Sequence, residues 1–426
     1  MTWFRAALVV VVVAALATGW WWGVPAADSG EELPPAGDGP YLICTGPLAG
    51  GGLTARVGVY SDEPSPIQLS VVGAPAASTN VDPEGLGGAV VIVNDLAELG
   101  ATPLLVEGSG ALAGAVVAQS SEAVLLSSCL RADPGPVGLT GLDTSGDLSA
   151  VLHFVNPFAQ DAILALQIAS ELGIDTPGDL ESVRVPAGTH IEVPLTRPLS
   201  GRQAISVEAL ATSGLAAMGA IGSGTSDLTG TEARPGALQW AFPVPATALG
   251  GELHLRSVSD LIGDFRIDRL EAAGVTEGVA EGLLNPGEQV VVPLSEVLTA
   301  PGGLAVAATE PLVAGLVLDR AAGRLTVAGG APATRWVVPV TVPLGQATTF
   351  LWVLNLGSEA ATVSLSPLTA GAGIDQVTME AGSLAEITLP DLEGGGLLVE
   401  GDQPMVVVVA VAQGEAVAAT LASPLE

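Results

Sequence analysis

The sequence has few of the residues on which most enzymes and nucleic-acid-binding proteins depend. Its 426 residues include three histidines and two cysteines, and all 13 basic residues are arginines because lysine is absent. Against 45 acidic residues, this gives a formal net charge of -32. Binding of nucleic acid needs a basic surface, and the same negative charge would repel an anionic membrane surface. The composition therefore predicts no nucleic-acid partner, but it is compatible with a basic partner.

Common catalytic motifs are also missing. The chain contains no G-x-S-x-G, no H-E-x-x-H and no phosphate-binding G-x-x-x-x-G-K-[ST]. His153 and His254 occur at nearly equivalent places in two repeated segments, VLHFVN and ELHLRS, which indicates strand-face positions rather than a site. We therefore expect a protein that is not an enzyme, with no catalytic residue and no cofactor.

Acidic clusters are the remaining candidates for metal binding, because Ca²⁺ prefers grouped carboxylate oxygens. The two groups are Asp143–Asp147 and the set of Asp260, Asp264 and Asp268. Neither matches a D-x-[DN]-x-[DN]-G loop, and Arg266 and Arg269 beside the second group favour simple ion pairs. The sequence predicts no metal site.

The two cysteines, Cys44 and Cys129, bracket the first part of the body. In an oxidising compartment they are expected to form a disulfide, with two buried free thiols as the alternative. The loop of about 85 residues that they would close contributes up to about 4–5 kcal/mol if the bond acts on the entropy of the unfolded chain. No C-x-x-C pair or neighbouring histidine suggests zinc.

The amino end carries a long uncharged and strongly apolar run. After Arg5, residues 6–24 hold no charge, which approaches the roughly 20 residues of a membrane-spanning helix. Trp20, Trp21 and Trp22 suit an interfacial belt, and the charges favour a cytoplasmic amino end with the body outside. We expect a transmembrane anchor at 1–26 and an acidic, proline-rich stalk at 27–40. A cleaved signal peptide, which gives a secreted protein, is the alternative.

The body is predicted to be all-β. Its 55 glycines and 31 prolines separate short runs of valine, alanine, leucine and threonine. Four units with the same ingredients follow one another, at 41–132, 133–236, 237–333 and 334–426. The fold class expected is four tandem immunoglobulin-like β-sandwiches, with a β-propeller as the alternative.

Two features recur in these units. Each opens with an apolar strand, and in two of these strands Trp240 and Trp336 take the same place, which favours core packing. Three of the units also contain what reads as a short hairpin around a turn with glycine, and the first unit has a weaker copy without the turn. The opening strands are Tyr41–Cys44, Leu125–Cys129, Leu238–Val244 and Arg335–Val340. The hairpins are Val183–Leu195, Asn285–Leu294 and Met379–Leu389, with Gly88–Leu96 as a weaker copy.

Differences between the copies are where a site is expected. His190 lies in one hairpin only, and the places of its counterparts hold Gln289–Val290 and Leu384–Ala385. Two segments, Gly222–Ala237 and Ala272–Leu284, read as long loops between units. Because loops often carry binding residues, we expect any site there rather than in the hairpins.

Several motifs resemble a repeat of secreted bacterial proteins. They are LHFVNP at Leu152–Pro157, VRVPAG at Val183–Gly188 and LAVAATEPLVAG at Leu304–Gly315. With the amino-terminal anchor and the lysine-free composition, the chain resembles a family of membrane-anchored extracytoplasmic β-repeat proteins of actinobacteria, a domain of unknown function. The resemblance implies a β-repeat body outside the membrane and brings no catalytic residues.

Together these observations predict a non-catalytic protein of the cell envelope that binds or scaffolds. Its partner would be another envelope protein or a cell-wall glycan, and its contact with the membrane would be the amino-terminal helix. Two alternatives are an accessory subunit of an envelope enzyme, such as a glycosyltransferase or peptidase, and a divergent hydrolase that uses carboxylates alone.

Overall fold

The structure is a computed structural model. It describes residues 40–45, 54–83, 88–92, 103–110, 112–119, 124–223, 228–248, 250–272, 274–298, 300–321, 323–339, 347–368, 375–389, 396–414 and 416–425. They belong to one compact unit, Leu33–Glu426. The predicted anchor at 1–26 and all but the last residue of the predicted stalk lie outside the described residues. In the part that is described, no helix is long and apolar enough to cross a membrane.

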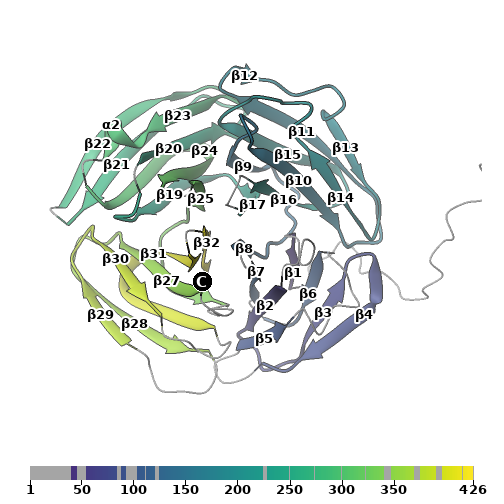
Figure 1. The fold of residues 1–426 in the computed structure, drawn as a ribbon, viewed down its shortest axis with the longest axis horizontal. Coiled ribbons are helices and arrows are strands. Elements are labelled where there is room, and N and C mark those ends of the chain that lie inside the picture. The colour runs from purple at the N-terminus through teal and green to yellow at the C-terminus, as the bar shows by residue number, and fades with distance from the viewer. Residues whose placement is uncertain are drawn as a thin grey trace, which may run out of the picture. The chain divides into compact units, whose positions relative to one another are not determined.

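The described residues form four β-sandwich modules, each made of antiparallel sheets (Figure 1). Within a module, two sets of four strands face each other across apolar side chains. This confirms the predicted fold class of tandem immunoglobulin-like sandwiches. The β-propeller is not supported, because the strands of a module form two facing layers rather than one blade of consecutive hairpins.

The first module contains one sheet in the order β1-β6-β3-β4 and a second in the order β5-β2-β7-β8. Its strands are β1 (Tyr41–Cys44), β2 (Thr54–Ser61), β3 (Ile67–Val71), β4 (Ala74–Val81), β5 (Gly88–Ile92), β6 (Leu104–Glu107), β7 (Leu112–Gln119) and β8 (Val124–Ser128). The segment Leu125–Cys129 was predicted to open the second unit, and that prediction is wrong. Leu125–Ser128 lies in β8, which pairs with β7 and ends the first module, and Cys129 follows this strand.

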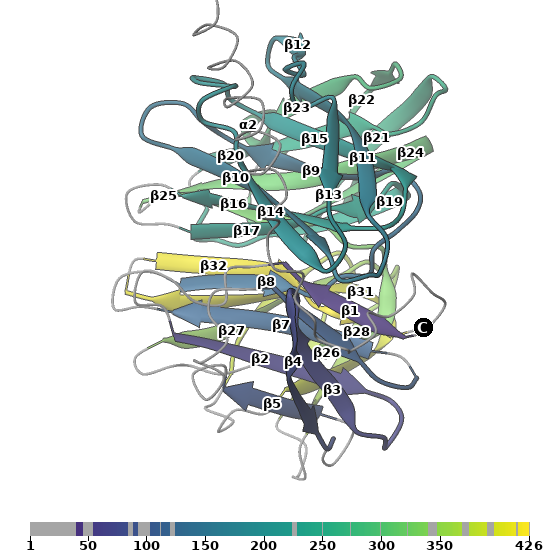
Figure 2. The ribbon, with the colours of Figure 1, turned by 90° about the vertical axis from the view of Figure 1, so that its right-hand side faces the viewer.

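The second module repeats this order, with β13-β11-β15-β9 in one layer and β14-β10-β16-β17 in the other. Figure 2 shows β10, β16 and β17 side by side in the second layer. The strands are β9 (Val137–Leu142), β10 (Ser149–Asn156), β11 (Ala162–Ser170), β12 (Gly173–Ile174), β13 (Ser182–Val185), β14 (Thr189–Pro194), β15 (Ile205–Ser213), β16 (Ala217–Ser223), β17 (Leu228–Glu232) and β18 (Arg234–Pro235). Leu152 of β10 and Leu164 of β11 meet in its core.

In the third and fourth modules one long strand joins the two layers. The first part of β24 (Gly302–Arg320) pairs with β19 and β21, and its second part pairs with β20 and β25. The other strands of the third module are β19 (Ala237–Val244), β20 (Gly250–Ser257), β21 (Gly263–Glu271), β22 (Gly274–Leu284), β23 (Gln289–Pro293) and β25 (Gly323–Ala328), with a short helix, α2 (Leu294–Val297).

The fourth module uses β31 (Leu397–Gln413) in the same way, pairing with β26 and β28 and then with β27 and β32. Its remaining strands are β26 (Ala333–Val338), β27 (Thr348–Asn355), β28 (Ala361–Pro367), β29 (Asp375–Met379), β30 (Leu384–Thr388), β32 (Ala416–Leu421) and β33 (Ser423–Pro424). Trp240 and Trp336 occupy matching core positions, as predicted. Each indole donates a hydrogen bond to a backbone oxygen of the long strand, that of Leu312 or Met405.

The recurring turn does not form a hairpin, so that prediction is wrong. In the second module, β13 pairs with β11 and β14 pairs with β10, which places the two strands in opposite layers. The turn is a crossing between layers. Its glycine has φ of 65° at Gly188, 68° at Gly287 and 68° at Gly382, a left-handed conformation that favours glycine.

Both predicted long loops contain strands. Gly222–Ala237 holds β17 and β18, and Ala272–Leu284 holds β22. The strand β17 is equivalent to β8, β25 and β32, the last strand in the second layer of each module. These four edge strands contact one another (Figure 1). Mutual contact covers edges that would otherwise present unpaired backbone groups.

Candidate functional site

The junctions between modules reuse one position of the repeat. It is the next-to-last residue of the second strand, which holds Tyr60 in β2, Val155 in β10, Arg256 in β20 and Leu354 in β27. Each of these side chains is buried. Each points toward a neighbouring module, so the four junctions can be compared at this one position.

Three of the four junctions are apolar at this position. Val155 shares a cluster with Tyr41 and Phe158, whose rings meet edge-to-face at 5.2 Å between centroids. Leu354 lies directly against Gly303 of the third module. Tyr60 packs with Val337, Leu368 and Leu398 of the fourth module.

The junction between the second and third modules has Arg256 instead, with its side chain fully buried. Its Nη2 donates to Gln167 Oε1 at 2.7 Å, to the Gln167 backbone oxygen at 3.3 Å and to Glu208 Oε2 at 3.3 Å. Its Nη1 donates to Ser206 Oγ at 3.3 Å. A charged side chain from one module is thus held by the polar groups of another.

The electrostatics of this junction are set mainly by burial. Burial lowers the pKa of the Arg256 guanidinium, and Glu208 opposes that shift. Burial raises the pKa of the Glu208 carboxyl, while the charge and hydrogen bond of Arg256 act in the opposite direction. Each charge therefore depends on the other, because a buried charge without its partner is strongly unfavourable.

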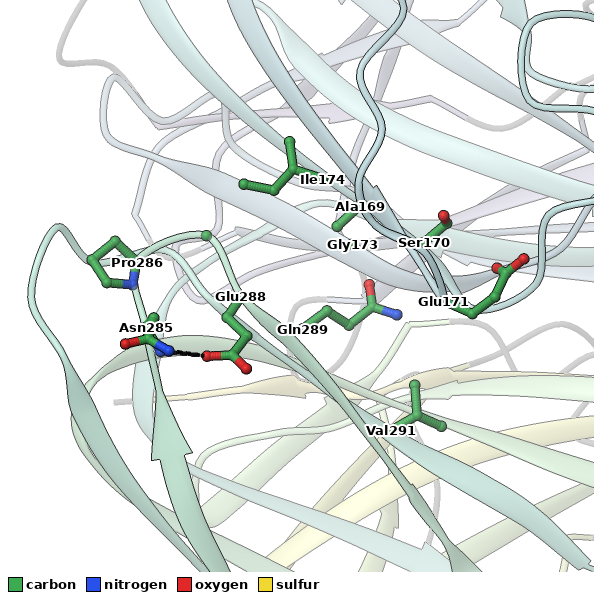
Figure 3. A pocket seen from close by; sticks show the side chains of 11 residues that line it. Ala169, Ser170, Glu171, Gly173, Ile174, Asn285, Pro286, Glu288, Gln289 and Val291 are labelled. Atoms are coloured by element: carbon green, nitrogen blue, oxygen red, sulfur yellow. Dashed lines mark hydrogen bonds between the residues drawn. The ribbon is translucent and has the colours of Figure 1, made fainter.

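A pocket of about 500 Å³ opens beside this cluster (Figure 3). Gln289 connects the two, since its amide accepts from Ser206 Oγ and donates to the backbone oxygen of Ala204. In Figure 3 the side chain of Gln289 lies between those of Glu288 and Glu171. The walls come from the end of β11, from the turn after it and β12, and from the turn before β23 and β23 itself: Ala169, Ser170, Glu171, Gly173, Ile174, Asn285, Pro286, Gly287, Glu288, Gln289 and Val291.

The lining suits a ligand that donates hydrogen bonds. Its two carboxylates come from different modules, Glu171 from the second and Glu288 from the third. Glu171 accepts from the backbone NH of Gln203 at 2.7 Å, and Glu288 accepts from Asn285 Nδ2 at 2.6 Å. Such carboxylates retain free lone pairs for an amine or a sugar hydroxyl.

The sequence-predicted candidates are structural. Asp143 accepts from Arg324 Nη1 at 2.9 Å, and Asp268 accepts from Arg266 Nη2 at 3.0 Å. His254 lies 3.2 Å from Glu252, which also bonds Arg324. Among the described residues, no group of three His, Cys, Asp or Glu side chains could hold a metal ion.

The disulfide expected between Cys44 and Cys129 is present. Cys44 ends β1 in one layer of the first module, and Cys129 follows β8 in the other layer. The bond therefore ties the two layers of one sandwich together. It also lies against Gly114 of β7, where an added side chain would press on Cys129.

Replacing Gly287 with alanine should weaken the junction between the second and third modules. A Cβ at Gly287 would overlap Gln167 Oε1, an acceptor of Arg256, and the φ of 68° is unfavourable for alanine. We expect a loss of about 2–4 kcal/mol in the free energy of unfolding, from strain and overpacking together. Chemical denaturation measures it. Gly173→Ala in the same pocket is the matched control, because its φ is also positive but its Cβ would meet nothing within 4 Å. Equal losses in both variants would contradict the role of the Gln167 contact.

Comparison with known proteins adds no family. No protein-family model and no curated protein matches the chain. The resemblance to an actinobacterial family therefore stays a prediction.

Among solved structures the similarities are distant. A pilus backbone protein of Streptococcus pneumoniae is 10% identical, covers 48% of this chain and 80% of its own, and has a TM-score of 0.12. The major pilin of Streptococcus pyogenes is 7% identical, covers 68% and 98%, and has a TM-score of 0.15. An α-L-rhamnosidase of Streptomyces avermitilis is 10% identical, covers 82% and 54%, and has a TM-score of 0.15. TM-scores this low carry no argument about function.

Proposed function

We propose that the protein is a non-catalytic scaffold of the cell envelope that offers a rigid β-sandwich body to a partner outside the cytoplasm. The observation that supports this most directly is the set of four junctions. At each one a buried side chain fixes a module to its neighbour, which suits a body that presents a binding surface without moving. His254 lies beside Glu252, and the buried Arg256 is held by Gln167 and Glu208, so both side chains serve packing and ion pairing.

The proposed location rests on the amino-terminal sequence and the disulfide. Residues 1–26 would anchor the chain in the membrane with the amino end in the cytoplasm, and residues 27–40 would hold the body away from it. A disulfide between the layers of the first module fits an oxidising compartment. Secretion after signal cleavage is the alternative, and it gives the body the same surroundings.

The proposed recognition site is the pocket between the second and third modules. Its partner would be an envelope protein that inserts an amine-bearing side chain, or a cell-wall glycan that offers hydroxyls. Both provide the hydrogen-bond donors that Glu171 and Glu288 can accept. Ligand sites often lie in pockets at domain interfaces, and this pocket is lined by residues of two modules.

Changing both carboxylates to amides should weaken partner binding. For the variant Glu171→Gln with Glu288→Gln, we expect a loss of more than about tenfold in affinity, since a hydrogen bond to a charged group contributes about 1.5–3 kcal/mol. Full-length protein would be tested against solubilised envelope proteins by co-purification and against isolated wall glycan by sedimentation.

The control is Glu359→Gln with Glu380→Gln, two exposed carboxylates around the corresponding turn of the fourth module. Equal binding by the pocket variant and wild type would reject this site. A copurifying glycosyltransferase or peptidase would favour the accessory-subunit alternative. Glycan turnover that is lost in the pocket variant would show a carboxylate-based hydrolase and overturn the proposal of a non-catalytic protein.

A further inference from the structure

A second polar cluster lies where the last strands of the modules meet. Glu232 ends β17, and its side chain is 1% exposed. Its Oε1 accepts from the backbone NH of Ser128 at 2.6 Å, and Ser128 ends β8 of the first module. The Ser128 hydroxyl lies 2.8 Å from Thr420 Oγ1 and donates to the Leu421 backbone oxygen at 3.0 Å. Glu232 thus stands at the end of a chain of contacts through three modules.

Glu232 also lines a small cavity. The space open to the centre of a water-sized sphere is about 10 Å³, and strands β9, β17, β24 and β25 contribute to its lining. Three of the lining residues have a buried polar atom without a hydrogen-bond partner in the protein. These atoms are Thr140 Oγ1, Glu232 Oε2 and Arg234 Nε.

Three unpartnered polar atoms on residues that line one cavity are unusual, because buried polar groups nearly always have a hydrogen-bond partner. Glu232 and Arg234 do not satisfy each other directly, since Arg234 Nη2 lies 3.9 Å from Glu232 Oε2. That separation is too long for a hydrogen bond. One small molecule between them would complete all three atoms.

We propose that this cavity is a binding site for a single water molecule that bridges Thr140, Glu232 and Arg234. Water can donate to Glu232 Oε2, accept from Arg234 Nε and use the Thr140 hydroxyl in either sense. A buried water typically makes about three hydrogen bonds and needs about this much room. A bare cation would be repelled by Arg234, and an anion would be repelled by Glu232.

The size of the site is set by glycine. A Cβ on Gly315 would overlap Thr140 Oγ1, and one on Gly138 would lie 3.0 Å from Val313. Gly315 therefore leaves room for the hydroxyl of Thr140. The water would therefore satisfy Oε2 of Glu232, while Oε1 of the same side chain bonds Ser128 of the first module.

The arrangement makes the junction sensitive to pH. Burial raises the pKa of Glu232, while Arg234, the Ser127 side chain and the Ser128 amide act in the opposite direction. In the part of the chain that the structure describes, Arg234 is the charged group that acts on this carboxyl. A carboxyl with a raised pKa favours the folded state most below its unfolded value of about 4.3, and this contribution falls as pH rises through the folded pKa.

The direct test is a high-resolution crystal structure of the body at pH 5 and at pH 8. We expect one ordered water within about 3.2 Å of all three atoms. A metal ion or an anion in its place, or no ordered density, would overturn the proposal. In Thr140→Val, which retains the shape of the side chain, we expect the occupancy of this water to fall, and an unchanged occupancy would contradict the three-partner site.

A solution test uses Glu232→Gln, which keeps an acceptor for Ser128 and removes the charge. We expect its denaturation midpoint to rise relative to wild type as pH increases from 5 to 8. The control, Glu277→Gln on exposed β22, should show no such trend. A parallel pH profile for Glu232→Gln and wild type would contradict the proposed role of the buried carboxylate. Ligand binding at the pocket of Figure 3 is not involved in either readout.

Discussion

Removal of the Cys44–Cys129 disulfide is expected to lower the free energy of unfolding of the first module by about 4–5 kcal/mol. The bond closes a loop with a sequence separation of 85 residues, and this magnitude follows from the entropy that it removes from the unfolded chain. It also joins the opening strand of one layer to the end of the other. Without it, the two layers are held together by packing and by the backbone hydrogen bonds between Ile43 of β1 and Leu130 after β8.

Denaturation of Cys44→Ala with Cys129→Ala, followed by far-ultraviolet circular dichroism, measures this loss. Wild type with reductant is the control, because it breaks the bond without changing any side-chain carbon. We expect an early transition from the first module in both samples, followed by the other modules. Unfolding at the wild-type midpoint in both would show that the disulfide does not hold the layers together.

Loss of the Arg256 side chain is expected to be the most damaging single change at a junction. Arg256→Ala should lower the free energy of unfolding by about 3–5 kcal/mol, because it leaves Glu208 as a partly buried charge without its partner. The Glu208 side chain is 20% exposed, so water compensates in part and the lower end of this range is expected. Calorimetry and limited proteolysis between the second and third modules would measure the effect.

The equivalent residue of the fourth module supplies the comparison. Leu354→Ala should lose about 2–5 kcal/mol by leaving a cavity, with no change in electrostatics. Arg256→Leu introduces the leucine that the fourth module has at this position. On its own it should still be destabilising, because it leaves Glu208 without its partner. Adding Glu208→Leu to Arg256→Leu should recover stability, since replacing a whole buried ion pair is often neutral. No recovery in the double variant would mean that Gln167 and Ser206 carry the junction.

The repeat and the core could be read from the sequence because both depend on local pattern. Alternating strands recur in the copies, the glycine turn recurs in three of them and the tryptophan in two, and Trp240 and Trp336 are placed as expected. Which strands pair with each other could not be predicted from the sequence. The strands around Gly188 look like a hairpin over a short span, but β13 and β14 pair with different layers through residues distant in sequence.

The strands that were missed have a common cause. Leu228–Glu232 reads LTGTE and Gly274–Leu284 reads GVTEGVAEGLL, both too rich in glycine and polar residues to suggest a strand. In β17 the burial of Glu232 comes from other modules, which local sequence does not reveal. Arg256 was also missed, although a signal existed. Aligning VLHFVN, ELHLRS and FLWVLN places Arg256 where the other copies have Val155 and Leu354.

The contact of Tyr60 with the fourth module bears on why there are four copies. Separate subunits joined head to tail either polymerise or stop at a fixed number, and they stop when the last subunit meets the first. Here the same junction position links the first module to the fourth as well as each module to its predecessor. An additional copy inserted by gene duplication would have to break the Tyr60 contact to be accommodated. The contact between the first and fourth modules therefore constrains the number of modules. Gain or loss of a whole module is expected to be unfavourable.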